Sequence, residues 1–449
     1  MLKNKNCWAT LLMLVSISSV AQTGTSSPYS LTGLGELKYR GFAQHTAMGG
    51  ATISQQSDNS FNPANPASFA SLRFTVFDVG ANMSLGTLSN ASLSAETRSG
   101  NFTHFAMAFP FETKKKMAVS FGTGQYSDIG YEIKNTDNAD TPVNYSFYKG
   151  DGGINRVYVG YGIEIIKNLN VGANVNYNFG NIQNLKAKIY PLTNNVFSYS
   201  DETYYAYRGV DLDLGVQYSV YDTIRSNKEK AGVLKHTFGG AFHTKSSLRG
   251  NGYRSSQSFF GTQFEQGNDG FIDSLMIRNN LKDTLTKPAG FTLGYTLSKG
   301  KQWSVSAEIE QNLWSSVSSG GNTKYFNNTR YSAGFTIVPK PSYDVAGGFF
   351  KKVRYSAGFR FENLYYNFDT KPPIQEPIQE LGISFGLGLP IVKSVRLEEE
   401  KVAVVSMINI TAEYVKRGRT TNGLIQEEYL NIRLGLNLND KWFTKRKYR

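Results

Sequence analysis

The segment "KNLNVGANVNYNFG" (Lys167–Gly180) decides the fold class, because its residues alternate strictly between two chemistries. Its even positions hold only asparagine and glycine, and its odd positions from 169 onward hold Leu169, Val171, Ala173, Val175, Tyr177 and Phe179. Successive side chains of a β-strand point to opposite faces. Small and amide residues suit a crowded, hydrated lumen, and a wholly apolar opposite face suits lipid. The segment therefore predicts one strand of a transmembrane β-barrel rather than of a soluble sandwich.

The same alternation recurs along the chain. There are about 14 such segments, an even number as single-chain bacterial barrels require, near residues 72–88, 101–111, 116–134, 154–166, 168–181, 203–221, 233–250, 287–298, 302–314, 328–338, 353–367, 379–391, 402–416 and 427–438. Tight turns alternate with long polar connections, the longest at 135–153, 182–202 and 251–286. Short periplasmic turns and long external loops explain this pattern. We expect an all-β fold, an antiparallel barrel over residues 72–438 with both chain ends in the periplasm.

Residues 1–21 have the features of a secretory signal peptide: a basic start, an apolar run too short to span a membrane, and small residues before Gln22. The one cysteine, Cys7, falls in this segment, so we expect no disulfide and no cysteine-based metal site in the mature chain. A net charge of +13 can indicate nucleic-acid binding. An exported chain is not expected to meet nucleic acid, so we expect the outer membrane and its lipid as surroundings.

Residues 22–71 have no place in the wall and are rich in glycine, serine and asparagine, with apolar residues spread among them. A wide barrel lumen needs either a water channel or a plug, and this composition favours a packed plug, or hatch. Near its end, "NPASFASL" predicts one short helix that leads into the first strand. Asn65 can cap this helix, with Pro66 at the first helical position, where a missing N–H costs nothing.

The leader and the barrel together resemble a known family. "AMGGA" (residues 47–51) and "NPA" (residues 65–67) before a barrel of about 14 strands resemble the OMPP1/FadL/TodX outer-membrane transport proteins. The stretches "SPYSLTGLGEL" (27–37) and "LGLNLNDKWFTKRKYR" (434–449) look like its Bacteroidota branch, which has PorV-like relatives. The resemblance implies lateral diffusion of a hydrophobic small molecule, of fatty-acid or aromatic type, or of a detergent in its place. It also implies a hatch motif at Asn62, Pro63, Ala64, Asn65, Pro66 and Ala67.

In that family a kinked third strand opens a lateral gap. Here the third expected strand loses its alternation in "GTGQYSD" (122–128), and glycine inside a strand is typical of a bulge or kink. A lateral gate is therefore expected at Gly122, Gly124, Tyr126, Ser127, Asp128 and Gly130. The alternative is a position at the barrel rim, beyond the lipid.

The connection at 251–286 carries aromatic residues in otherwise polar surroundings. Exposed apolar clusters usually mark a ligand or a partner, so we expect such a contact at Phe259, Phe260, Phe264 and Phe271. The alternative is that these rings pack on the loop's own core.

The sequence does not suggest an enzyme. None of the four histidines lies in a recognisable nucleophile or paired-carboxylate setting, and we expect no metal and no cofactor. Several charged residues alternate with aliphatic ones and are expected to form a charge network in the lumen: Asp211, Asp213, Glu308, Glu310, Arg360 and Glu362.

A second function remains open. Bacteroidota barrels that resemble this family also serve as plugged docking subunits of outer-membrane protein machines, in type 9 secretion or in barrel assembly. The long external loops and the basic periplasmic tail at 439–449 are compatible with protein partners in the outer membrane. For the tail, anchoring by Trp442 and Phe443 at the membrane interface is the alternative.

Overall fold

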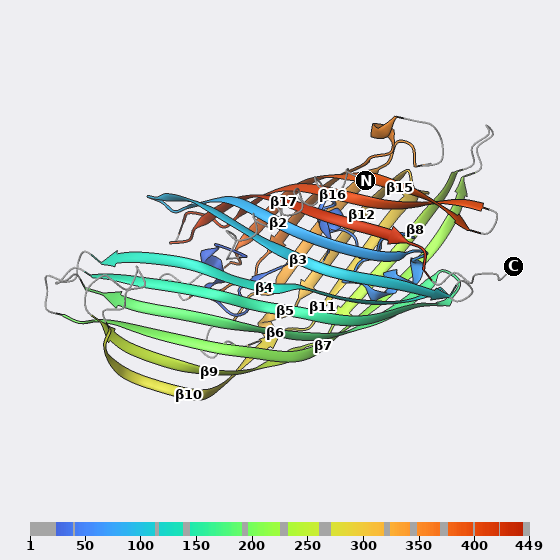
Figure 1. Cartoon of the computed structure of the whole chain (residues 1–449). Coiled ribbons are helices and arrows are strands. Elements are labelled where there is room, and N and C mark those ends of the chain that lie inside the picture. The colour runs from blue at the N-terminus through green and yellow to red at the C-terminus, as the bar shows by residue number, and fades with distance from the viewer. Residues whose placement is uncertain are drawn as a thin grey trace, which may run out of the picture.

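The last strand of the chain pairs with the first strand of the wall, and this pairing closes the sheet into a barrel (Figure 1). The computed structural model describes residues 24–38, 41–112, 116–137, 144–190, 196–224, 232–259, 271–317, 324–341, 348–368, 376–397, 400–421 and 423–442. Within this part of the chain, no helix is long and apolar enough to cross a membrane.

All neighbouring wall strands are antiparallel. The strands of the wall are β2 (Thr75–Ser89), β3 (Ser94–Glu112), β4 (Met117–Asp137), β5 (Asn144–Ile166), β6 (Leu169–Ile189), β7 (Ser198–Ile224), β8 (Gly232–His243), β9 (Ser246–Phe259), β10 (Phe271–Lys287), β11 (Gly290–Lys299), β12 (Trp303–Asn312), β13 (Asn328–Ile337), β14 (Arg354–Asn363), β15 (Gln379–Leu397), β16 (Glu400–Arg417) and β17 (Gln426–Asp440).

Two wall strands are interrupted in the middle. β8 and β9 both pair with β7, and β11 and β10 continue that arrangement on the other side. β8 and β9 are therefore the two halves of one wall strand, and β10 and β11 are the two halves of the next. Counted in this way, the described residues form a closed, antiparallel barrel of fourteen strands, which confirms the expected fold class.

The alternation on β6 has the expected orientation. Val175 and Tyr177 are 55% and 46% exposed on the outside, whereas Asn174, Asn176 and Asn178 are buried in the interior. An apolar outer face and an amide-lined inner face match a wall between lipid and a polar lumen.

The long external connections are shorter than expected. Much of 135–153, 182–202 and 251–286 is strand, because β4–β5, β6–β7 and β9–β10 continue as hairpins and reach farthest at the left of Figure 1. Outside lipid neither face of a sheet has to be apolar, so the sequence alternation fades while the backbone ladder continues. Period-two analysis therefore ends these strands too early.

The leader lies inside the barrel, where Figure 1 shows it in dark blue. Its elements are η2 (Pro28–Leu31), β1 (Glu36–Leu37), α2 (Ala43–Thr46) and η3 (Pro66–Ser71), and two further 3-10 turns in the connections are η6 (Trp314–Ser316) and η7 (Phe349–Lys351). The short helix expected after Asn65 is thus a 3-10 helix. The expected signal peptide at 1–21 lies outside the described residues, and so do residues 443–449 of the expected tail. Trp442, just before them, packs against Phe77 and Phe109, with ring centroids 5.4 and 5.6 Å away.

Glycines in the wall allow the leader to approach the sheet closely. A Cβ built at Gly215 on β7 would lie 2.1 Å from Asn65 Oδ1, and one at Gly172 on β6 would lie 2.5 Å from the Pro66 carbonyl carbon. On the other side of the lumen, a Cβ at Gly358 on β14 would lie 2.0 Å from the Gly49 nitrogen. The small inward residues that the sequence alternates along these strands are the contact surface for the leader.

We expect Gly215→Ala to destabilise the protein by about 1–3 kcal/mol, since the added methyl group must displace Asn65 or Pro66. Urea unfolding in detergent micelles, followed by circular dichroism, measures the change. The control is Gly348→Ala, where a Cβ meets nothing within 4 Å. Equal unfolding midpoints for the two variants would contradict this close packing.

Candidate functional site

The wall has a seam between β3 and β4. These strands pair only from the turn end up to His104 opposite Gly124. Beyond that point β3 continues to pair with β2 as far as Ser94, and β4 continues to pair with β5 as far as Asp137. Figure 1 shows the two strands diverging toward the left. The seam is therefore a split in an otherwise continuous sheet.

Irregular backbone lies on both sides of the seam. The β4–β5 register shifts between Gln125 and Ser127, and the β2–β3 register shifts between Gly80 and Ala81. Such bulges bend a strand and increase its twist, so they turn β3 and β4 away from each other. One side-chain bond still crosses the seam, from Asn101 Nδ2 to Gln125 Oε1 at 2.5 Å.

The leader covers the exposed edge of β4. Glu36 and Leu37 of β1 pair antiparallel with Asp128 and Ser127, and the Lys38 amide donates to the Tyr126 carbonyl at 2.9 Å. A strand edge with unpaired N–H and C=O groups is costly away from water. β1 thus supplies, from inside the barrel, the hydrogen bonds that β3 no longer provides.

The six expected gate residues all lie along this edge of β4. Gly122 and Gly124 face the last paired residues of β3, and Tyr126 lies at the bulge. Ser127 and Asp128 pair with β1, and a Cβ at Gly130 would lie 2.1 Å from the Thr25 carbonyl oxygen of the leader. The structure brings these residues together against the leader. Whether they form a gate stays a prediction.

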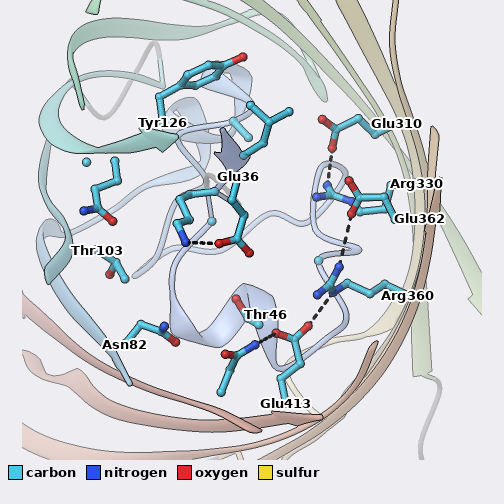
Figure 2. Close-up of a pocket in the computed structure, with 18 of the residues that line it drawn as sticks. Glu36, Thr46, Asn82, Thr103, Tyr126, Glu310, Arg330, Arg360, Glu362 and Glu413 are labelled. Carbon is cyan, nitrogen blue, oxygen red and sulfur yellow. Dashed lines mark hydrogen bonds and ion pairs between the residues drawn. The ribbon is translucent and has the colours of Figure 1, made fainter. Parts of the chain in front are cut away.

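Behind the seam lies a chamber of about 210 Å³ between the leader and the wall (Figure 2). Asn101 and Thr103 of β3, Gln125 and Tyr126 of β4, and Glu36 of the leader contribute to its lining. The opposite wall contributes charged side chains from β12 to β17: Glu308, Glu310, Arg330, Arg360, Glu362, Glu380, Glu413, Arg417 and Arg433. Charged side chains thus line one wall of the chamber.

These charges form one connected network. Figure 2 shows Arg330 beside Glu310, and Arg360 between Glu362 and Glu413. Arg360 lies 3.4 Å from the Glu362 carboxylate and 2.6 Å from that of Glu413. Arg330, Arg360 and Arg417 each have more than one carboxylate partner, which offsets the cost of burying their charge.

Arg417 ties the leader to this network. Its guanidinium lies 2.7 Å from Glu36 of β1 and 3.1 Å from Glu427 of β17, and it also contacts Glu380 of β15. Burial raises the pKa of Glu36, but the charges of Lys38 and Arg417 outweigh it and hold that pKa well below its usual range. Glu36 is therefore ionised, and the ion pair holds β1 in the lumen.

An aromatic cluster covers the chamber on the side of the long hairpins. Trp314 and Tyr365 stack with ring centroids 3.9 Å apart, and Tyr29 of the leader stacks on Tyr366 at 6.0 Å. The Tyr365 hydroxyl donates to the Gly35 carbonyl at 2.5 Å. These rings belong to a large buried apolar cluster.

A second apolar cluster lies toward the turn end of β3 and β4. Phe42, Phe61 and Phe69 of the leader pack edge to face at 5.2 and 5.4 Å, against Val76 and Ala118 of the wall. In the adjoining helix α2, His45 Nδ1 accepts the Phe42 amide at 3.0 Å. Burial lowers the pKa of His45 to about 3, so the ring is neutral and available as this acceptor.

The expected hatch motif fastens the end of the leader to β6 and β7. Asn65 Oδ1 accepts the Ala67 amide at 3.1 Å and caps η3, and its Nδ2 donates to the Ile53 carbonyl at 2.7 Å. Asn174 of β6 donates to the Pro63 carbonyl at 2.8 Å. Asn62 Oδ1 accepts the Ala64 amide at 3.0 Å. Pro66 is the first residue of η3.

The aromatic residues expected in one loop are not all in a loop. Phe259 ends β9 and Phe271 begins β10, and the two are cross-strand partners. The Phe259 ring is buried in a cluster with Tyr145, Phe147 and Ile189. For this ring the structure supports packing within the hairpins. Phe260 and Phe264 lie outside the described residues.

Sequence analysis missed the residues that hold the leader in place. β1 has only two residues, too few for any alternation to be recognised. Glu380, Glu413 and Glu427 do stand at inward positions of their strands, and this pattern was the available signal. Their partners Glu36 and Arg417 are far apart in the chain, so no local pattern connects them.

Solved structures of several outer-membrane proteins share this fold at low identity. A Pseudomonas aeruginosa FadL homologue matches with TM-score 0.59 and 14% identity over 90% of this chain and 99% of that chain. The Ralstonia pickettii toluene transporter TbuX matches with TM-score 0.54 and 14% identity over 90% and 99%. The CymD monoaromatic hydrocarbon channel matches with TM-score 0.53 and 12% identity over 91% and 98%.

These identities show the fold alone, so the expected FadL/TodX resemblance holds at the level of architecture. No curated protein matches the sequence. A family model described as BamG matches residues 1–449. Since that match spans the whole chain, the protein belongs to the BamG family.

Proposed function

We propose that this protein is a closed outer-membrane barrel that serves as an accessory, docking subunit of a barrel-assembly machine. The observation that carries the proposal is the leader held in the lumen: it pairs with β4 at the seam, joins the charge network through Glu36, and packs into an apolar cluster on each side of the chamber. The family name BamG, which follows the naming of barrel-assembly subunits, supports it.

The charged chamber is a poor path for a hydrophobic compound. An apolar molecule in it would separate carboxylates and guanidinium groups from their partners, and unpaired buried charges are costly. Of the two functions that the sequence left open, the leader in the lumen and the ion pairs around it favour the docking subunit over the transporter.

The projecting hairpins offer a surface for a partner. Ile272, Leu275 and Ile277 on β10 are 44%, 62% and 58% exposed. Phe197, just before β7, and Tyr199, near the start of that strand, are also exposed. These residues lie beyond the part of the hairpins that faces lipid. Exposed apolar groups of this size are typical of protein contacts.

The proposed role needs no catalysis, and we propose that the protein is not an enzyme. Two wall histidines have structural partners: His104 Nε2 lies 2.9 Å from Asp78 Oδ1, and His236 Nδ1 lies 2.7 Å from the Tyr295 hydroxyl. His45 is held in the leader by the Phe42 amide.

Passage of a hydrophobic small molecule is the second candidate, and the seam between β3 and β4 is the observation that favours it. The solved structures with this fold include a toluene transporter and a monoaromatic hydrocarbon channel. In this chain such passage would require β1 to leave the edge of β4.

Affinity purification of the full chain in mild detergent tests the docking role. We expect stoichiometric recovery of barrel-assembly subunits, and a reduced yield from L275N/I277N because the exposed apolar contact is lost. The control variant is Leu93→Asn, at a residue that is 73% exposed in the β2–β3 connection. A strictly monomeric wild-type eluate would contradict the proposal.

A disulfide between β1 and β4 separates the two candidate functions. Leu37 and Ser127 are antiparallel partners, close enough for a cross-link, and the sequence has no cysteine beyond Cys7. We expect oxidised L37C/S127C to sustain outer-membrane barrel assembly as well as wild type, because docking does not require the leader to move.

Uptake of labelled toluene and of a labelled long-chain fatty acid is measured on the same cells, with the reduced variant as the control. Loss of uptake on oxidation, restored by reduction, would contradict a role in docking alone. It would favour passage of a hydrophobic compound at the seam.

We expect Arg417→Gln to lower the free energy of unfolding by about 3–5 kcal/mol, because it leaves Glu36, Glu380 and Glu427 without their common cation. Urea unfolding in micelles measures the loss. Arg419→Gln is the matched control, since the Arg419 side chain is 43% exposed and pairs with Glu376 only at 3.7 Å, and we expect it to cost less than about 1 kcal/mol. Similar losses for both variants would show that the network does not hold the leader.

A further inference from the structure

A groove of about 800 Å³ lies on the outside of the barrel, across β6, β7, β9 and β10. At its centre Arg208 of β7 is the direct cross-strand partner of Arg249 of β9, and Phe179 of β6 is the partner of Arg208 on the other side. Both arginines and Phe179 are exposed. The groove thus carries two adjacent guanidinium groups on one face of the sheet.

These arginines lie at one edge of the band of apolar residues on the outer face of the barrel. After Arg208, the outward residues of β7 are Val210, Leu212, Leu214, Val216, Tyr218 and Val220, all of them exposed. A membrane-spanning strand needs about 9–11 residues, which this stretch supplies. The arginine pair therefore lies where the chain leaves the hydrocarbon layer, on the side of the β6–β7 connection.

The positive charges of the groove have no carboxylate partner within the described part of the chain. Like charges placed directly opposite in a sheet are destabilising, and among the described residues no carboxylate pairs with Arg208 or Arg249. Lys282 is a third cation in the groove and donates to Asn251 Oδ1 at 3.1 Å. The described lining of the groove contains neither aspartate nor glutamate.

Aromatic rings lie on both sides of the pair formed by Arg208 and Arg249. Tyr177 and Phe179 stack at 5.8 Å on the side of the apolar band, and Tyr204 and Tyr253 stack at 5.4 Å on the far side. Aromatic residues at such a boundary are typical of contact with lipid headgroups. Two guanidinium groups side by side match the geometry of a phosphate.

We propose that this groove binds the phosphate of an outer-leaflet lipid headgroup, with the acyl chains of that lipid along Tyr177 and Phe179. The proposal depends on the proposed outer-membrane location and not on the docking role, so one can fail without the other.

The test is lipid binding by the full-length protein in nanodiscs of neutral phospholipid, measured by native mass spectrometry during titration with phosphorylated lipid A. We expect R208Q/R249Q to weaken binding at least tenfold. R254Q/R278Q is the matched control, because Arg254 and Arg278 are also cross-strand partners, and Arg254 pairs with Asp201 through two bonds of 2.8 Å. Arg254 is five residues from Arg249 in one regular strand, so it lies on the opposite face.

We expect this control variant to bind like wild type, dephosphorylated lipid A to bind at least tenfold more weakly than the phosphorylated form, and inorganic phosphate not to compete at equimolar concentration with the lipid. Equal binding of phosphorylated lipid A by wild type and R208Q/R249Q would overturn the proposal. Equal binding of dephosphorylated lipid A would overturn the role of the phosphate, and competition by equimolar phosphate would overturn a lipid as the source.

Discussion

The structure depends on one constraint: a strand edge inside a membrane barrel must find partners for its backbone N–H and C=O groups. β3 and β4 separate beyond His104, and β4 would have no partner on that side. The leader provides one at Glu36 and Leu37, with the Lys38 amide continuing the ladder. The seam leaves the edge of β4 without a partner, and the leader in the lumen supplies that partner.

The same constraint explains why the leader is attached to the wall by ion pairs. A two-residue strand contributes little by itself, so β1 needs further attachments. Arg417 joins Glu36 to carboxylates of β15 and β17, and the aromatic stack around Tyr29 and Tyr365 covers the hairpin side. Solved hydrocarbon channels share the architecture at 12–14% identity, so the fold alone does not decide what the interior of this barrel does.

Strands that face lipid were predictable from sequence, because lipid on one side and a wet lumen on the other impose period two, as between Leu169 and Phe179 on β6. The hairpin extensions were not, since water on both faces removes that period. β1 was beyond prediction because two residues carry no pattern, and Arg417 because its partner Glu36 is almost the whole chain away. The expected gate residues were found together because glycines and a bulge leave a local mark in sequence.

The position of the leader at the start of the chain also has a consequence for folding order. Ser27 donates to Glu427 at 2.7 Å, across 400 residues of sequence, and β17 pairs with β2 to close the wall. The leader is synthesised before the wall strands, so Ser27 obtains this contact only when the last strands have formed. Attachment of the start of the leader and closure of the barrel therefore both require the last strands, and a chain that lacks its final hairpin would leave Glu36 without Arg417.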